Sequence, residues 1–182
     1  MDFPLVLKKV LSAFQEHQIR YALIGGFAMG LWGLPRATVD LDFLVAAEDM
    51  PQVHAIMKTL GYSRRYHSDN VSQYASDLWF WGTVGFLQAF RKASLGMLKR
   101  AVIKELYGRT IEIKVATIED LIGLKIQALT NDPTRRSSDL ADIETLLDLH
   151  NSHLDWDLLE GYFQLFEQTD VLRRLKEKYG CP

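Results

Sequence analysis

The chain has 182 residues, enough for one domain with a buried core and a small helical appendage. Its only cysteine is Cys181, which excludes a disulfide framework and a cysteine-rich metal site and fits a reducing, cytoplasmic setting. With 21 basic and 23 acidic side chains the formal net charge is -2, so the chain as a whole is not strongly attracted to a phosphate backbone. It carries no leader-like segment and no apolar run of about 20 residues, so we expect a soluble protein with no membrane segment.

The first part of the chain alternates between helical and strand patterns. Asp2, as a capping residue, together with Pro4 predicts a helix that ends near His17. Alternating side chains over 19–24 predict a strand that runs into Gly25-Gly26 and is followed by a short helix from Phe27 to about Trp32. The β-branched and aromatic segment 38–45 predicts a second strand.

The remaining elements complete an α+β layout. The patterns predict a helix over 53–60 ended by Gly61, strands over 71–75 and 78–89, a helix over 95–105 and a strand over 111–115. From Thr117 onward the pattern is helical, with Thr117 and Ser138 as caps of successive helices and a third helix from about Asp155. We therefore expect a mixed sheet and helices in residues 1–116, and a helical C-terminal portion, 117–182, packed on that core.

Two carboxylates on one strand are the first candidate for chemistry. Because side chains of a strand alternate between its faces, Asp40 and Asp42 share one face. They repel each other and lose solvation if that face is enclosed. A divalent cation relieves this conflict, and carboxylate oxygens suit Mg²⁺. The alternative is an ordinary exposed strand face decorated with two acids.

A glycine pair precedes the carboxylates. Gly25-Gly26, between a strand and a short helix, lets the backbone approach an anion such as a triphosphate, although an ordinary tight turn has the same composition. Arg36 and Thr38 stand just ahead of Asp40 and are further candidates for nucleotide contacts. We expect the two carboxylates at the rim of a pocket that contains the glycine turn.

These segments together resemble a known family signature. The stretches Ile24-Gly25-Gly26-Phe27-Ala28 and Gly33 to Asp42 are similar to the signature of the polymerase β-type nucleotidyltransferase superfamily, and in particular to the AbiEii toxin-like nucleotidyltransferase group. The resemblance implies a short mixed sheet backed by helices. It also implies an enzyme that moves a nucleoside monophosphate from a nucleoside triphosphate to an acceptor hydroxyl, with the glycine pair on the phosphates and Asp40 and Asp42 on Mg²⁺.

A second match lies downstream. It consists of Thr117 to Lys125, an arginine at 135 or 136, and Asp139 to Ile143, and it resembles the region of the same group in which Glu-Asp-Leu is followed by a lysine, an arginine and two aspartates. By that resemblance Lys125 acts in catalysis and binds the triphosphate; the alternative is a surface lysine. Asp139 and Asp142 have a second interpretation as helical ion-pair partners of Arg135 or Arg136.

The chain departs from the family pattern at Gly85. Members usually carry a third carboxylate on this central strand, which completes the metal site or accepts the proton of the attacking hydroxyl. We expect Gly85 on the face shared by Asp40 and Asp42, and Gly85→Asp would then strengthen Mg²⁺ binding and raise transfer. Asp77 replaces the missing group only if the strand register differs. A non-catalytic nucleotide-binding or protein-interaction module is the rival interpretation.

The acceptor stays open at this stage. The toxin-like resemblance implies a tRNA or another RNA and an antitoxin partner, whereas small antibiotic nucleotidyltransferases imply an aminoglycoside or lincosamide. Trp79 and Trp81 alternate in the expected strand 78–89 and either stack on a base or pack in the sheet. His150 and His153 have a metal-site spacing, but they also suit an ordinary helix end.

Overall fold

The computed structural model describes residues 1–179; Cys181 lies outside this range. Contacts between Cα atoms divide the chain into two compact units. The sheet unit comprises Met1–Leu31 and Pro35–Thr117, and the helical unit comprises Trp32–Leu34 and the chain from Ile118 onward. The packing of the helical portion on the core therefore stays a prediction, and each unit is described by itself.

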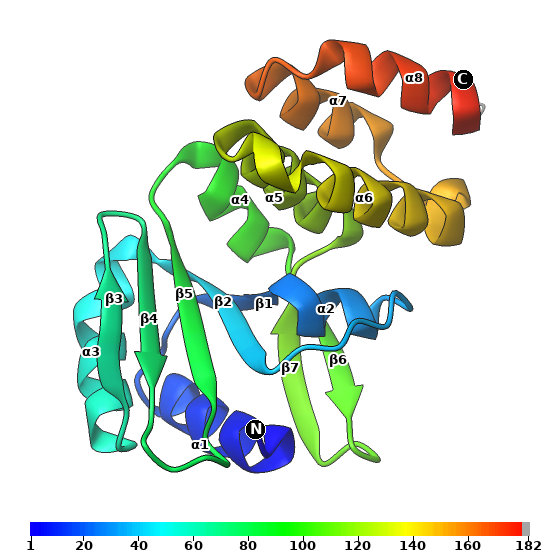
Figure 1. The fold of residues 1–182 in the computed structure, drawn as a ribbon. Helices are drawn as coiled ribbons and strands as arrows, with labels where there is room; N and C mark the ends of the chain where they lie inside the picture. Colours follow the sequence, from blue (N-terminus) through cyan, green and yellow to red (C-terminus); the bar gives the residue numbers. More distant parts are fainter. Residues whose placement is uncertain (180–182) are drawn as a thin grey trace. The chain divides into compact units, whose positions relative to one another are not determined.

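The sheet unit is built on seven strands (Figure 1). They are β1 (Tyr21–Ile24), β2 (Asp40–Ala46), β3 (Ser63–His67), β4 (Val71–Ala75), β5 (Thr83–Ala89), β6 (Val102–Leu106) and β7 (Ile111–Val115). Their order across the sheet is β3-β4-β5-β2-β1-β7-β6, with β2 parallel to β5, β1 parallel to β7 and all other neighbours antiparallel. The predicted α+β class and mixed sheet are confirmed.

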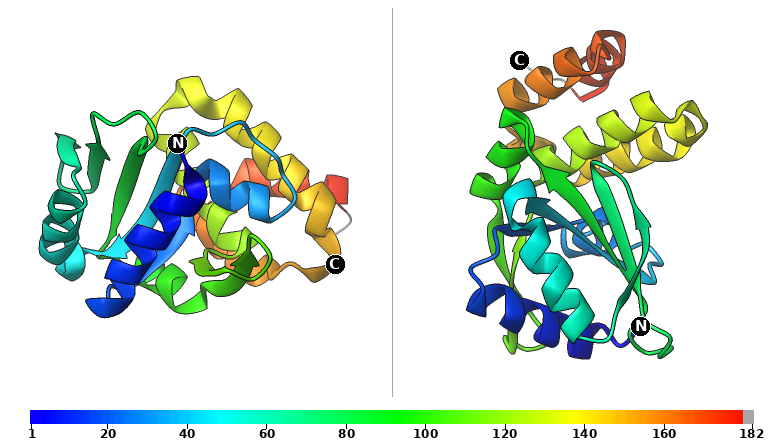
Figure 2. Two further views of the ribbon diagram at one scale, coloured as in Figure 1. Left: turned by 90° about the horizontal axis from the view of Figure 1, so that it is seen from below. Right: turned by 90° about the vertical axis from the view of Figure 1, so that its left-hand side faces the viewer.

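Two helices cover one face of this sheet, as Figures 1 and 2 show: α1 (Phe3–Glu16) and α3 (Met50–Thr59). The predicted cap of α1 is confirmed, because the Leu5 N–H donates to Asp2 Oδ1 at 3.1 Å. The Phe14 ring lies 5.6 Å from the Phe43 ring and 6.2 Å from the Phe86 ring. These buried aromatic contacts fix which face of β2 is core, and the alternation of the strand leaves Asp40 and Asp42 on the opposite face.

The sheet unit holds two further helices, α2 (Gly25–Leu31) and α4 (Lys92–Arg100). The helical unit consists of α5 (Ile118–Asn131), α6 (Arg136–His150), α7 (Trp156–Leu165) and α8 (Thr169–Tyr179). In it the Tyr162 hydroxyl donates to the buried Asp120 carboxylate at 2.6 Å. The Tyr162 ring lies against α5 where Gly123 has no side chain, since a Cβ there would come within 2.7 Å of the ring.

The predicted helix over 95–105 is wrong in its second half. The helix α4 ends at Arg100, and Val102–Leu106 forms the edge strand β6. This strand pairs with β7 through a turn in which Tyr107, Gly108 and Arg109 all have positive φ. The hydrogen bonds to β7 and the β-branched pair at 102 and 103 outweigh a local helical pattern.

The strand predicted over 78–89 begins later, at Thr83. Residues 76–82 form the loop from β4 to β5, so Trp79 and Trp81 do not alternate in a strand. Trp81 packs against Tyr62 with ring centroids 5.5 Å apart, whereas Trp79 is 86% exposed. The strand β3 was not predicted, because all five of its side chains are exposed and it shows no apolar alternation.

One predicted helix boundary in the second half is also wrong. α6 begins at Arg136 rather than after Ser138, because Asp132 caps a 3-10 turn that leads directly into the helix. The Ser138 hydroxyl donates instead to the Arg135 carbonyl at 3.0 Å. The helix predicted from about Asp155 is confirmed, because α7 begins at Trp156 and the Leu158 N–H donates to Asp155 Oδ1 at 2.9 Å. The helix α8 follows after a break at which Glu167 has a φ of 54°.

Within residues 1–179 no helix combines the length and the apolar character needed to cross a membrane.

Candidate functional site

The structure brings the predicted carboxylates and the glycine turn together. Asp42 on β2 pairs with Ile24, the last residue of β1, and Gly25 follows directly. A Cβ at Gly25 would lie 3.0 Å from the Asp42 Cβ and closer still to its carboxylate. Gly25 also has a φ of +70°, which favours glycine. The carboxylate of Asp42 therefore lies directly against the turn.

Thr38 belongs to the same cluster. A Cβ at Gly26 would lie 3.3 Å from the Thr38 Cβ, so the absence of a side chain at Gly26 makes room for Thr38. The Asp40 N–H donates to Thr38 Oγ1 at 3.3 Å, and the Thr38 hydroxyl lies 3.1 Å from the Asp40 carbonyl. Arg36 is exposed in the loop that leads to Thr38. We call Gly25, Gly26, Thr38, Asp40 and Asp42 the carboxylate cluster.

The electrostatics of the cluster fit a cation. Burial, and then the negative charge of Asp40, raise the pKa of Asp42 from 3.8 to about 6. A carboxylate held in this way is more stable with a proton or a positive ion beside it. The oxygen donors of Asp40 and Asp42 are those that Mg²⁺ takes in proteins, usually with phosphate and water completing its shell. The chemistry of these two carboxylates therefore fits a magnesium ion.

The raised pKa of Asp42 predicts a pH dependence of stability without metal. Between about pH 4 and pH 6 the folded chain keeps the Asp42 proton while the unfolded chain loses it. The free energy of unfolding in EDTA should therefore fall as the pH rises through this window, by roughly 1–3 kcal/mol. Urea unfolding at several pH values measures the fall, and Asp42→Asn should remove it. An unchanged slope in Asp42→Asn would assign the effect to another group; Asp69→Asn, at an exposed position, is the control.

Gly85 lies where it was predicted. It pairs with Asp42 in the parallel ladder between β2 and β5, so the two residues share a face. A Cβ at Gly85 would lie 2.5 Å from Asp42 Oδ1. The Asp42 carboxylate thus lies between two glycines, Gly25 and Gly85, and occupies part of the space that a side chain at position 85 would need. Sequence reasoning missed this steric role.

This contact changes the expected result for Gly85 variants. Both Gly85→Ala and Gly85→Asp should lower Mg²⁺-dependent nucleotide affinity, by about ten-fold, because the new Cβ displaces Asp42 from its place. Isothermal titration calorimetry with Mg²⁺ and a nucleoside triphosphate measures the change. If Gly85→Asp instead strengthened binding while Gly85→Ala weakened it, Gly85 would mark a lost third ligand, as the sequence alone suggested.

Lys125 lies in a buried ion cluster of the helical unit. Its Nζ donates to Asp139 Oδ1 at 2.7 Å and to Asp142 Oδ2 at 2.6 Å, and its side chain is only 13% exposed. The interpretation as a surface lysine is therefore wrong. Arg135 Nε also donates to Asp139 at 3.1 Å, which confirms one of the predicted helical pairs. Burial disfavours the charge on Asp139, but the bonds from Arg135 and Lys125 outweigh it and hold its pKa below the ordinary value. A role for Lys125 at a triphosphate stays a prediction.

The weaker candidates have other partners or positions. Asp77 lies in the loop 76–82, is largely exposed and pairs with Arg65 at 2.6 Å. His150 Nε2 lies 2.6 Å from the Trp32 carbonyl. In the part of the chain that the structure describes, no group of three or more His, Cys, Asp or Glu side chains is placed to hold a metal ion.

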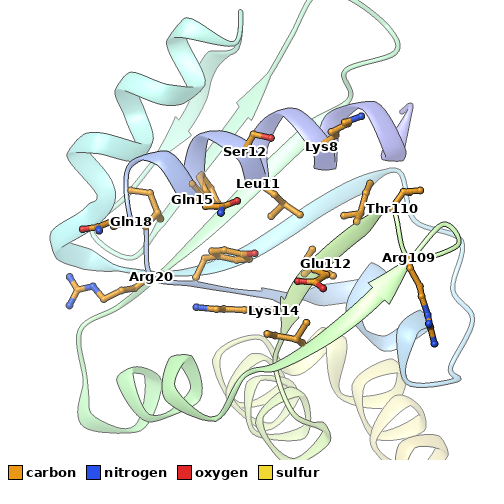
Figure 3. A pocket seen from close by; sticks show the side chains of 16 residues that line it. Lys8, Leu11, Ser12, Gln15, Gln18, Arg20, Arg109, Thr110, Glu112 and Lys114 are labelled. Atoms are coloured by element: carbon orange, nitrogen blue, oxygen red, sulfur yellow. The ribbon is translucent and has the colours of Figure 1, made fainter.

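A cavity of about 840 Å³ opens elsewhere in the sheet unit, between α1 and the strands β1 and β7 (Figure 3). Lys8, Gln15, Glu112 and Lys114 are among the polar side chains around it. No residue of the carboxylate cluster lines it. It adjoins the start of β1, whereas the glycine turn follows the end of that strand. The pocket expected around the glycine turn stays a prediction.

The sheet unit combines a strand that carries an Asp-x-Asp pair with a neighbouring strand that runs through a glycine turn into a helix. This combination is typical of the polymerase β-type nucleotidyltransferases. Sequence comparison places the chain in this class. A family described as uncharacterised nucleotidyltransferases matches residues 5–119, and the family of the AbiEii nucleotidyl transferase toxin of type IV toxin–antitoxin systems matches residues 86–178. Each match covers more than half of the chain, so the chain belongs to these nucleotidyltransferase families and is an enzyme of that class. A search of curated protein sequences found no significant match.

Solved structures share the fold at low sequence identity. The crystal structure of ANT(2'')-Ia in complex with adenylyl-2''-tobramycin matches with a TM-score of 0.64 and 16% identity, over 91% of this chain and 97% of that one. The lincomycin-bound lincosamide antibiotic adenylyltransferase LnuA matches with a TM-score of 0.53 and 13% identity, over 79% and 96%. A putative nucleotidyltransferase from Thermotoga maritima matches with a TM-score of 0.55 and 16% identity, over 74% and 91%. At these identities the likeness concerns the fold.

Proposed function

We propose that this nucleotidyltransferase transfers a nucleoside monophosphate from a nucleoside triphosphate to an acceptor hydroxyl, with Mg²⁺ held by Asp40 and Asp42. The placement of Asp42 carries the proposal. Its carboxylate lies between Gly25 and Gly85, on one strand face with Asp40, and its pKa is raised to about 6. Two acids that repel each other in a confined place are costly unless a cation joins them.

The other residues of the cluster have roles that follow from their positions. Gly25 and Gly26 carry no side chains, which lets the Asp42 carboxylate and Thr38 lie directly against the turn. The glycine pair is the proposed contact of the nucleotide phosphates. Thr38 fixes the backbone of Asp40, and Arg36 supplies a positive charge in the same loop. Mg²⁺ would neutralise the carboxylates and the phosphate oxygens between them. Lys125 is the proposed second cation for the triphosphate.

The favoured acceptor is an RNA, such as a tRNA, in a toxin–antitoxin setting with an antitoxin protein as partner. The match of residues 86–178 to the AbiEii toxin family supports this choice. Trp79 adds a second observation. Its side chain is 86% exposed in the loop that leads into Thr83, and Thr83 pairs with Asp40 across the sheet. An exposed indole in the loop that leads into this strand suits the stacking of an unpaired base.

The second candidate acceptor is the hydroxyl of a small antibiotic. The shared fold with ANT(2'')-Ia and LnuA, over most of the length of each, supports it. The third candidate is a nucleotide-binding or protein-interaction module without turnover. It is favoured by the glycine at position 85, because this position lacks the carboxylate that would accept the proton of the attacking hydroxyl.

The test is a transfer assay with the whole chain. Nucleoside triphosphates labelled at the α-phosphate are incubated with Mg²⁺ and total tRNA, tobramycin or lincomycin, and nucleotide binding is measured in parallel with and without Mg²⁺. Label in the tRNA fraction supports the RNA acceptor, and label on an antibiotic supports the second candidate. Mg²⁺-dependent binding without any transfer supports the module. A chain that binds no nucleotide under any of these conditions contradicts the proposal.

A further inference from the structure

One edge of β7 has a neighbouring strand along only part of its length. β6 pairs with β7 along its whole length on one side, whereas on the other side β1 pairs with it at one position, Leu23 with Val115. The Ala116 N–H donates to the Leu23 carbonyl at 3.0 Å and so points toward β1. Because the backbone groups of a strand alternate between its two edges, the N–H and carbonyl of Glu112 point the same way. Within residues 1–179 neither of these two groups has a backbone partner.

The cavity beside α1 takes the place of the missing strand (Figure 3). Its lining comes from α1, β1, β7 and their neighbours, all of which belong to the sheet unit. Leu11, Ile111 and Ile113 supply apolar lining. Tyr21 lies where β1 joins β7: burial raises its pKa, and a hydrogen bond from the Lys114 backbone partly offsets this. The Tyr21 side chain thus closes one end of the open edge, and Glu112 holds its centre.

The length of the open edge suits a short extended segment. An extended chain rises about 3.3 Å per residue, so the stretch 111–113 can pair with about three residues of another strand. The cavity of about 840 Å³ leaves room for their side chains. An occupant in extended conformation could exchange two main-chain hydrogen bonds with Glu112, as neighbouring strands do.

The charges around the cavity are mostly positive. Both arginines of the lining are already paired with acids outside it. Lys8 and Lys114 are exposed lining residues, and no ion pair joins either of them to an acid in the part of the chain that the structure describes. Among the described residues, Glu112 is the only acid in the lining. An occupant with negative side chains therefore complements the charge of the cavity.

We infer that this cavity binds an extended, acidic segment of a partner protein, which pairs with β7 at Glu112 and is selected by Lys8 and Lys114. A strand edge without a neighbour is the structure to which an extended peptide adds as a further strand. In that mode main-chain hydrogen bonds give affinity and the surrounding side chains give specificity. The cavity shares no residue with the carboxylate cluster, so the inference goes beyond the proposed transfer reaction and does not depend on it.

The experiment uses the whole chain, isotope-labelled for NMR, and a hexapeptide of alternating glutamate and valine that is blocked at both ends. Amide chemical shifts detect binding up to millimolar dissociation constants and locate it on the chain. One control peptide carries lysine in place of each glutamate. A second keeps the acidic sequence but is N-methylated at every backbone nitrogen, so it retains the charges and cannot donate main-chain hydrogen bonds. Citrate, an anion without a peptide backbone, tests for a simple anion site.

We expect the acidic peptide to shift the amide signals of Glu112 and Lys114 and to slow hydrogen exchange at the Glu112 amide by about ten-fold, because a new hydrogen bond protects it. N-methylation should weaken binding by about ten-fold, as the loss of main-chain hydrogen bonds predicts. Lys8→Glu should weaken binding of the acidic peptide by about five-fold. Lys9→Glu changes the net charge equally, at an exposed position outside the lining, and should stay within about two-fold of the wild type.

Several outcomes would overturn the inference. The acidic peptide at millimolar concentration leaves the amides of β7 unshifted, or the lysine peptide binds as tightly as the acidic one. Equal affinity of the N-methylated peptide would exclude pairing with the strand. Citrate that shifts the same amides at the same concentration would assign the cavity to small anions instead. Nucleotides take no part in these measurements, so a failure of the proposed transfer reaction leaves their interpretation unchanged.

Discussion

Replacement of both Asp40 and Asp42 by asparagine is expected to abolish Mg²⁺-dependent nucleotide binding while the fold persists. The amide groups carry no charge, so the cation loses its two carboxylate ligands. In EDTA the double variant should be more stable than the wild type at neutral pH, by roughly 1–3 kcal/mol, because two repelling charges are removed and one of them is confined. Calorimetric titration with a nucleoside triphosphate measures the first effect, and urea unfolding measures the second.

The matched control for this experiment removes the same number of negative charges, but from exposed positions. Asp69→Asn with Asp77→Asn also removes two negative charges, but neither residue lies on β2. Its nucleotide affinity should equal that of the wild type. Mg²⁺-dependent affinity that survives in the double variant of Asp40 and Asp42 would refute their role as metal ligands.

Lys125→Ala is expected to cost about 3–5 kcal/mol in the free energy of unfolding, because it removes from a largely buried cluster the ammonium group that donates to both Asp139 and Asp142, and leaves Arg135 beside Asp139. Urea unfolding measures the loss. Lys178→Ala is the control, because its ion pair with Glu144 is equally short but about half exposed, and such pairs contribute at most about 1 kcal/mol. Equal losses in the two variants would show that the Lys125 cluster is not a buried network.

The same variant tests the proposed contact of Lys125 with the triphosphate. If the ammonium group reaches the outer phosphates, Lys125→Ala should weaken the binding of a triphosphate more than that of a monophosphate. Equal weakening of both would assign Lys125 to the internal ion cluster alone. The measurement is made at a temperature where circular dichroism shows the variant to be folded.

Local patterns in the sequence were sufficient for several parts of this protein. Period 2 along β2 places Asp40 and Asp42 on one face whatever the strand pairs with, because alternation is a property of the extended backbone. The Asp2 cap and Pro4 fix the start of α1 through atoms within one helical turn. The motifs around Gly25 and Lys125 were likewise enough to identify the nucleotidyltransferase class.

Contacts between distant segments decided the rest. β3 and β6 are edge strands whose side chains are largely exposed, so only their hydrogen bonds to β4 and β7 define them. The sequence identified Gly85 only as the place of a missing carboxylate. The structure adds that a Cβ at this position would lie 2.5 Å from Asp42 Oδ1, so the glycine leaves room for that carboxylate. His150 and Trp32 are 118 positions apart, and no local pattern connects them. Side-chain alternation and helix capping depend on neighbours along the chain, whereas steric room around a carboxylate and the partner of a buried charge depend on which segments the fold brings together.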